Sequence, residues 1–329
     1  MVKLIFRRIF VSLLLVFGMV TLTFVVIRLA PGDPAMMFVS PEVNPVIAEQ
    51  IRLNYGLNDP LHIQYFRWLG LYQPFEGLLQ GNLGQSFMLH KPVWTVLSEA
   101  VPNTLILTLS ALIINFLTGI SLGVYSAYRE NKKSDRIISA VSIGFYSMPE
   151  FWLSLLLILF FSLFLGWLPS SLLHSTGYEN MSASGKIFDY IKHLILPLMV
   201  LGFFSSASTI KYMRGSVLDI LKSDYVKYAR MKGLSEKDVF FKHVFRNSLN
   251  PVFTLFGLYF PFLLGSSAIV EYVFALPGMG RITIDSIFAR DYPVIIATTI
   301  ISGIMVAAGN LLSDVLIILN DPRARRNAK

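Results

Sequence analysis

The sequence predicts an all-α integral membrane protein with six transmembrane helices. Composition is the first observation: 54% of the 329 residues are hydrophobic, only 15% are charged, and mean hydropathy is +0.60, whereas soluble domains average about 25% charged residues. The second observation is that the apolar residues lie in long runs rather than at half-buried spacing. The third is that basic residues stand beside these runs. We therefore expect the 329 residues to form several membrane spans and not soluble domains.

The first apolar run, Ile9 to Leu29, is long enough for a helix to cross about 30 Å of hydrocarbon at 1.5 Å per residue. Lys3, Arg7 and Arg8 precede it, so a cleaved signal peptide is the alternative. The apolar part of a signal peptide is only about 7 to 15 residues long and ends in a small-residue cleavage site. This run is longer and ends in Ile-Arg-Leu, so we expect an uncleaved first span.

Five further apolar runs complete the six predicted spans. They are Leu105 to Tyr128, Ile137 to Leu168, Ile191 to Tyr212, Phe253 to Val273 and Val294 to Leu319. Pro149 lies inside the third of these six runs and should kink or break it, because proline removes a helical hydrogen bond and clashes with the preceding turn. The sequence leaves open whether that run is one kinked helix or two pieces. We expect a single crossing there, since an odd number of crossings between Arg136 and Lys211 would put one basic cluster on the wrong face.

Basic residues predict the orientation, because Lys and Arg accumulate on the cytoplasmic side of membrane proteins. Most of the 28 basic residues lie at the N-terminus, in 129–136, in 211–246 and at the C-terminus. We therefore expect both termini in the cytoplasm. The predicted parts are 1–29 (N-terminus and first span), 30–103 (a small extracytoplasmic domain) and 104–329 (a five-span core with the cytoplasmic loop 213–251). Topology accounts for the net charge of +8, so we expect no nucleic-acid binding.

The chain lacks the sequence motifs of an ATPase and of common hydrolases. No phosphate-binding G-x-x-x-x-G-K-[ST] loop, H-E-x-x-H or G-x-S-x-G occurs, cysteine is absent, and the five histidines have no ligand spacing. We therefore expect no catalytic, cofactor-binding or metal-binding residue, and any energy must come from a partner. Asp314, one turn after Asn310, is interpreted as an interhelical hydrogen-bonding residue, with a proton carrier as the alternative. Gly119 and Gly123 predict close helix packing.

The loop 213–251 predicts two short helices with a break between them. The first covers Ser223 to Lys232 and ends at Gly233, as helices often end at glycine. Ser235 and Asp238 then resemble the start signal of a second helix that runs towards Pro251. A basic amphipathic loop lying on anionic lipid is the alternative.

This loop resembles the "EAA" loop of binding-protein-dependent ABC importer permeases. The resemblance lies in 224–235, DYVKYARMKGLS, and 243–251, HVFRNSLNP. It implies that the short helix around Ala229 and Gly233 sits in a groove of a cytoplasmic ATPase, where small residues allow close contact. This chain has Tyr228-Ala229-Arg230 where the motif has Glu-Ala-Ala, which leaves Tyr228 without a transferable role. The residues that the resemblance implies for coupling are Tyr228, Ala229, Arg230, Lys232, Gly233, Leu234, Ser235, Arg246, Asn247 and Pro251.

Other stretches resemble the dipeptide, oligopeptide and nickel branch of that family, in the same order along the chain. They are RLAPGDP at 28–34, GNLGQS at 81–86, SMPEFW at 147–152, and Asp314 followed by DPR at 321–323. Asn82 stands where the branch more often has Asp. The extracytoplasmic motif residues are Arg28, Pro31, Gly32, Asp33, Pro34, Gly81, Leu83, Gly84 and Ser86.

The resemblance implies the permease subunit of an ATP-driven importer, with peptides as cargo and alternating access as mechanism. It implies as partners a second homologous permease, two ABC ATPase subunits that bind ATP and Mg, and an external solute-binding protein, in the cytoplasmic (inner) membrane of a prokaryote. The same architecture could import nickel or another metal chelate. A stand-alone channel or ion-coupled carrier is an alternative from another class, and a membrane-embedded enzyme is a second.

Overall fold

The computed structural model describes residues 2–29, 49, 52–53, 56, 58–72 and 77–320. Apart from one isolated bridge between Gln85 and Pro92, the regular structure of these residues is helical. Two groups of predicted residues lie outside them: Pro31 to Pro34 and Asp321 to Arg323. The chain divides into two compact units, one made of Met1–Arg8, Thr104–Leu276 and Val306–Lys329, the other of Ile9–Asn103 and Pro277–Met305. The second unit groups 30–103 with parts of the first and last predicted spans.

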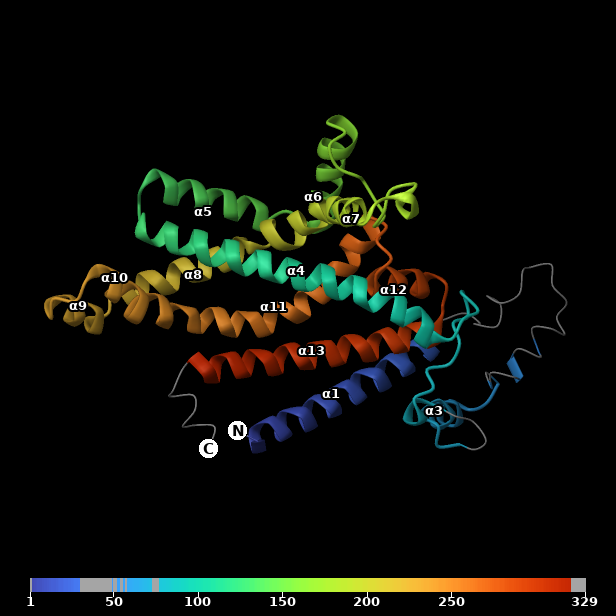
Figure 1. Cartoon of the computed structure of the whole chain (residues 1–329). Coiled ribbons are helices and arrows are strands. Elements are labelled where there is room, and N and C mark those ends of the chain that lie inside the picture. Colours follow the sequence, from blue (N-terminus) through green and yellow to red (C-terminus); the bar gives the residue numbers. More distant parts are fainter. Residues whose placement is uncertain are drawn as a thin grey trace. The chain divides into compact units, whose positions relative to one another are not determined.

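The second unit is built around the N-terminal helix and the start of the last one. It contains most of α1 (Val2–Leu29), α3 (Leu61–Leu69), η2 (Leu78–Gln80), the start of α4 (Val93–Tyr128), α12 (Met279–Phe288) and the first half of α13 (Tyr292–Asn320). Val20 and Phe24 of α1 are buried against Ile296 of α13, and the two helices run side by side (Figure 1). Trp68 of α3 stacks on Phe24 at 5.5 Å, which packs α3 onto the end of α1.

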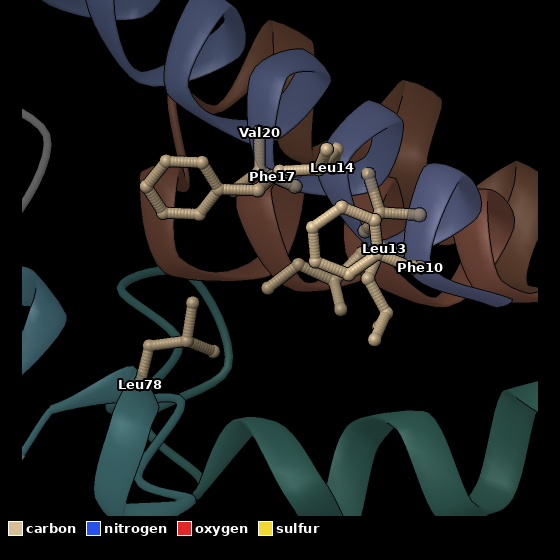
Figure 2. Close-up of a pocket in the computed structure, with 8 residues that line it drawn as sticks. Phe10, Leu13, Leu14, Phe17, Val20 and Leu78 are labelled. Carbon is tan, nitrogen blue, oxygen red and sulfur yellow. The ribbon is translucent and has the colours of Figure 1, made fainter. Parts of the chain in front are cut away.

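An apolar groove in this unit is lined mostly by α1, with Leu78 of η2 and Ile300 of α13 (Figure 2). Leu13, Leu14 and Phe17 of α1 face it, and Leu78 lies opposite. Its lining residues are all apolar. Sites for polar ligands usually contain a few placed polar groups, and the described lining of this groove has none.

The first unit contains the remaining helices. They are α5 (Lys133–Tyr146), α6 (Glu150–Leu157) with the π-helical η3 (Ile158–Phe164), η4 (Tyr178–Asn180), α7 (Ala183–Leu198) continuing through η5 (Met199–Phe204) into α8 (Ser206–Leu221), α9 (Asp224–Met231), and α10 (Glu236–Asp238) continuing through η6 (Val239–Phe245) into α11 (Arg246–Val273). Figure 1 shows α8 and α11 side by side, with α9 and α10 at one end of them.

Four helices among the described residues are long and apolar enough to cross a membrane: Phe6–Leu29, Val93–Tyr128, Ala183–Leu221 and Tyr292–Leu316. The third predicted run is in two pieces, α5 and α6 with η3, bent by 104° at the break before Glu150, and counts as a fifth span if the pair is one crossing. The predicted span Phe253 to Val273 lies within α11. The described residues are thus helical, with four or five candidate spans among them, and the count of six and the orientation stay predictions.

The glycine pair in α4 lies where a neighbouring helix approaches closely. A Cβ added at Gly119 would lie 2.4 Å from Thr209 Cγ2, and one at Gly123 would lie 2.7 Å from Met213 Cβ. Beside them, the Thr209 hydroxyl donates a 2.7 Å hydrogen bond to the side chain of the buried Asn115. The pair therefore lets α8 pack directly onto the α4 backbone, which is the role predicted for it.

Asp314, the acidic residue of the last predicted span, pairs with Arg8 of α1. The Arg8 Nε atom lies 3.2 Å from its carboxylate. Ser313, next in the chain, donates a 2.7 Å hydrogen bond to the Phe253 carbonyl of α11. The contact of Asp314 with another helix is therefore an ion pair, whereas the sequence led us to expect a hydrogen bond; its Oδ2 atom has no hydrogen-bond partner among the described residues.

Candidate functional site

Helix α9 is a short helix whose ends follow from local chemistry. It runs from Asp224 to Met231 and stops where Gly233 adopts a φ of +78°, a left-handed conformation that favours glycine. Two backbone bonds close the end, Leu234 N–H to the Ala229 carbonyl and Gly233 N–H to the Arg230 carbonyl. This is a Schellman motif, which satisfies carbonyls that the helix leaves free. The predicted glycine stop is confirmed.

A second helix begins two residues later, at the predicted start signal. The Ser235 hydroxyl accepts a 3.1 Å hydrogen bond from the Asp238 N–H and caps the helix. Lys242, 2.7 Å from the Asp238 carboxylate, and the hydroxyl of Ser235 lower the pKa of Asp238. Arg230 forms two hydrogen bonds to Glu236, at 2.9 and 3.2 Å, and so bridges the glycine break. The two helices are fixed at their junction by side chains from both.

The second helix does not end at Pro251. It continues from Glu236 through the π-helical η6 into α11, and Pro251 lies inside α11. A single proline removes only one backbone N–H. The π-helical η6 precedes Pro251, and the helix continues past this proline without ending. Arg246 and Asn247 are exposed at the start of α11, and the Asn247 amide reaches the Tyr225 hydroxyl of α9 at 3.3 Å. The predicted loop 213–251 is therefore mostly helical.

One face of α9 is buried in the chain's own core. Val226 and Ala229 pack into a cluster with Val217 of α8 and with Val239 and Val244 of η6. Ala229 is only 4% exposed. This corrects the expectation that Ala229 touches a partner's groove: its methyl group faces inward, and its small size fits packing within the chain.

The opposite face of α9 is exposed and mixes apolar with basic side chains. We call it the α9 surface, and it consists of Tyr228, Met231 and Leu234 with Lys227 and Lys232. Met231 is 76% exposed. Lys232 lies over the Tyr228 ring with its Nζ 4.8 Å from the ring centre. Exposed apolar side chains gathered on a polar helix are typical of an interaction site.

Arg28 and Ser86, which belong to two of the predicted extracytoplasmic motifs, both make contacts at the start of α13. Ser86 donates a 2.5 Å hydrogen bond to Asp291, which is fully buried and also accepts from the Met88 N–H at 3.0 Å. Arg28 lies over the Tyr292 ring at 5.4 Å. Two motifs that are far apart in sequence therefore meet at adjacent residues, Asp291 and Tyr292. The sequence carries no local signal for this meeting.

Gly81, Leu83 and Gly84, from the same motif as Ser86, form the loop that carries Ser86. Gly81 and Gly84 both have a φ of +80°. The Gly81 carbonyl accepts a 2.8 Å hydrogen bond from the Trp94 indole. Leu83, between the two glycines, is half-buried. The motif thus folds a tight loop back against the start of α4.

A cavity of about 930 Å³ lies in the first unit, where α5 breaks into α6 and faces η5, α8 and α11. We call it the α6 cavity. Its polar lining residues are Tyr146, Glu150, Ser205, Ser208, Tyr212 and Tyr259, and the rest of its lining is apolar and aromatic apart from Gly265. Volumes of roughly 300 to 1,000 Å³ with a few polar groups on apolar walls are typical of small-molecule sites.

Sequence reasoning overlooked Glu150 as a site residue. It belongs to the segment SMPEFW and stands near the middle of the apolar run Ile137 to Leu168. An acidic residue within an apolar run of spanning length is a candidate functional residue. The sequence therefore contains the acidic residue that marks this position, but the high mean hydropathy of the surrounding run makes it easy to overlook.

A model of the family described as "Binding-protein-dependent transport system inner membrane component" matches residues 119–326. The chain belongs to this family. A model of the N-terminal part of the same membrane components matches residues 1–108, so the two matches cover both the α9 region and the outer motifs. The family description makes the chain an inner-membrane component that works with a binding protein.

Relatives match this family member over almost its whole length. The oligopeptide transport system permease protein AppB of Bacillus subtilis is 41% identical over 320 residues, which are 97% of this chain and 98% of AppB. The di/tripeptide transport system permease protein DppB of Pseudomonas aeruginosa is 37% identical and covers 99% of both chains. The glutathione transport system permease protein GsiC of Salmonella paratyphi A is 36% identical over 92% of both.

A solved structure has the same helical fold. It is the MetNI methionine ABC transporter in an inward-facing conformation, matched with a TM-score of 0.55 at 18% identity. The match covers 69% of this chain and 97% of that one. At this identity the likeness concerns the fold alone.

Proposed function

We propose that this chain is the transmembrane permease subunit of an ATP-driven importer of peptides. It has six spans with both termini in the cytoplasm, and it pairs with a second, homologous permease. Two ATPase subunits bind ATP and Mg and supply the energy, and an external binding protein delivers the cargo. The names of the relatives support peptides as cargo, because they describe oligopeptide, di/tripeptide and glutathione transport.

The α9 surface is the observation that carries the coupling role. One face of α9 is locked into the core through Val226 and Ala229, while Met231 and its neighbours on the other face are exposed. A helix held rigidly on one side and presenting apolar groups on the other transmits a push from a partner to α8 and α11. The ATPase subunits close on ATP, displace α9, and so move the spans between two states.

Reconstitution tests this function. The purified complex of permeases, ATPases and binding protein in liposomes is expected to hydrolyse ATP faster when loaded binding protein is present, and to accumulate a labelled oligopeptide. Chelated nickel in place of peptide tests the other cargo of the resembled branch. Uptake by this chain alone, without ATPase, would contradict the proposal and favour a channel or carrier.

A further inference from the structure

Positive charge is concentrated in the turn between α4 and α5. We call this segment the basic turn, and its basic residues are Arg129, Lys132, Lys133 and Arg136. All four are exposed. Glu130, the exposed acidic residue of the turn, pairs with Lys222 at 3.3 Å. None of the four basic residues forms an ion pair within the part of the chain that the structure describes, so their charges are open to a ligand.

A buried carboxylate holds the basic turn in one shape. Asp135 accepts hydrogen bonds from the Ser126 hydroxyl and, at 2.9 Å, from the Asn131 N–H. Arg214 of α8 pairs with the same carboxylate at 2.7 and 2.8 Å. Asn131, in the middle of the turn, has a φ of +65°. The basic side chains therefore stand on a fixed backbone, which lowers the entropy cost of binding a ligand.

Helix stability does not explain the two lysines of the basic turn. Helix α5 begins at Lys133, and Lys132 occupies the capping position without a side-chain hydrogen bond to the helix. The helix dipole disfavours cations at this end, where Ser, Asp or Asn is the usual capping residue. The lysines thus lower the stability of α5, and an anion bound beside them would offset that cost.

Exposed apolar and aromatic side chains flank the basic turn on both helices. Tyr125 and Tyr128 are exposed at the end of α4, and Arg129 lies over the Tyr125 ring at 5.9 Å. Ile137 of α5 is 62% exposed, and Val141, one turn further, is also exposed. Basic side chains next to tyrosines and aliphatic groups fit the boundary between lipid headgroups and acyl chains.

We propose that the basic turn binds the phosphate headgroup of an anionic phospholipid. This inference rests on the proposed function, in which the second and third spans place the turn at the cytoplasmic membrane surface. Lys132, Lys133 and Arg136 bind the phosphate oxygens, and Ile137 and Val141 contact the acyl chains. Each Lys or Arg near an anionic membrane surface contributes about fivefold in affinity.

The surface of a cytoplasmic protein, such as an ATPase subunit, is the alternative occupant. The basic turn lies at the same end of its helices as the α9 region, since the Tyr128 ring is 5.4 Å from that of Phe240 in η6 (Figure 1). Exposed apolar side chains continue along α5 from Ile137 to Tyr146, however. Acyl chains cover such a face along its length, whereas a water-soluble partner covers only its end. The lipid therefore fits the whole surface better.

The test measures binding of labelled phosphatidylglycerol to the purified complex in phosphatidylcholine nanodiscs. The wild type is compared with the triple variant Lys132→Gln, Lys133→Gln and Arg136→Gln. The control removes the same charge from the predicted outer side, through Lys91→Gln, Lys186→Gln and Lys192→Gln. The first triple variant should bind the lipid about a hundredfold more weakly, because three contributions of about fivefold are lost. The control should bind it as the wild type does.

Thermal unfolding of the same samples separates lipid binding from structural damage. In phosphatidylcholine alone, the first triple variant should unfold at or above the wild-type temperature, because it loses lysines that the dipole of α5 disfavours. Added phosphatidylglycerol should raise the unfolding temperature of the wild type and of the control, and not of this variant.

Four results would overturn the inference. They are unchanged lipid binding in the first triple variant, equal weakening in both triple variants, displacement of the lipid by inorganic phosphate, and loss of the ATPase subunits with lipid binding intact. The second would reduce the effect to net charge, and the last would assign the basic turn to a protein partner. A wild-type complex that binds phosphatidylglycerol but imports no peptide would instead count against the proposed function.

Discussion

Asp135 and Arg214 form a two-pronged ion pair that joins α5 to α8, with Arg214 Nε 2.7 Å from one carboxylate oxygen and Nη2 2.8 Å from the other. Asp135 is buried and also accepts hydrogen bonds from the Ser126 hydroxyl and the Asn131 N–H. The pair therefore fixes the turn between α4 and α5 against the helix that leads into α9. Arg214 counted in the sequence only as a topology signal, yet it holds helices together.

Replacing Asp135 with Asn should destabilise the chain strongly. The change removes the carboxylate that the Arg214 guanidinium pairs with directly, and removing one partner of a buried pair costs about 3 to 5 kcal/mol. The control is Glu130→Gln, which removes the more exposed pair that Glu130 forms with Lys222 at 3.3 Å. Exposed pairs contribute about 0 to 1 kcal/mol. Thermal unfolding of the detergent-solubilised protein should separate the two variants by several degrees; equal melting would refute the role given to Asp135.

Gly233→Ala should weaken the coupling between ATP hydrolysis and transport, because it strains the backbone of the turn and not because the added methyl group clashes. At a φ of +78° an alanine is strained by about 1 to 2 kcal/mol, although its Cβ would meet no atom within 4 Å. Gly215, in α8, also has open space around a Cβ but no positive φ, so Gly215→Ala should stabilise its helix slightly. Binding-protein-stimulated ATP hydrolysis should fall in the first variant and hold in the second. The same fall in both would show that side-chain bulk, not the turn, matters.

Ala229 and Met231 should respond to substitution in different ways, because they lie on opposite faces of α9. Ala229→Leu overpacks the cluster and should cost about 1 to 3 kcal/mol, which loosens α9. Met231→Ala should leave the stability of the chain unchanged and weaken its hold on the ATPase subunits. Protease cleavage near Gly233 reports the first effect, and co-purification with the ATPase reports the second. Faster cleavage in Met231→Ala would contradict this division of roles.

Local chemistry made much of the α9 region predictable. A glycine after a short helix and a Ser-x-x-Asp start signal each act within a few residues, so the two helices and the break at Gly233 follow from sequence. The inward orientation of Ala229 does not, because it depends on Val217 and Val244, which reach it through tertiary packing. The family motif implies a groove contact for Ala229, whereas the structure buries this residue in the chain's own core.

Contacts between distant segments were not predictable from one sequence. Ser86 and Asp291 are 205 positions apart, and Asp135 and Arg214 are 79 apart. Pro149 predicted a kink in the third run, but the 104° bend depends on what packs around α6. For Glu150, the sequence shows its position within an apolar run, but not that it lines the α6 cavity, because the cavity is formed by helices that are distant in the sequence.

Ser86→Ala should destabilise the second unit by about 1 to 3 kcal/mol. Asp291 Oδ2 would keep only the Met88 N–H as donor, and its Oδ1 atom is buried without a hydrogen-bond partner among the described residues. A buried carboxylate that loses a donor carries its desolvation cost uncompensated. Because Tyr292 follows Asp291 and packs with Phe87, the loop carrying Ser86 should also loosen from the start of α13.

The matched control for this loop is Ser98→Ala in the first turns of α4. The Ser98 hydroxyl donates only to the Thr95 carbonyl of its own helix, at an exposed position. Its removal should cost little, since water replaces the bond. Limited proteolysis of 81–93, together with thermal unfolding, should therefore detect Ser86→Ala and not Ser98→Ala. If both variants behave as the wild type does, the outer motif does not act through Asp291, and its glycines alone shape the loop.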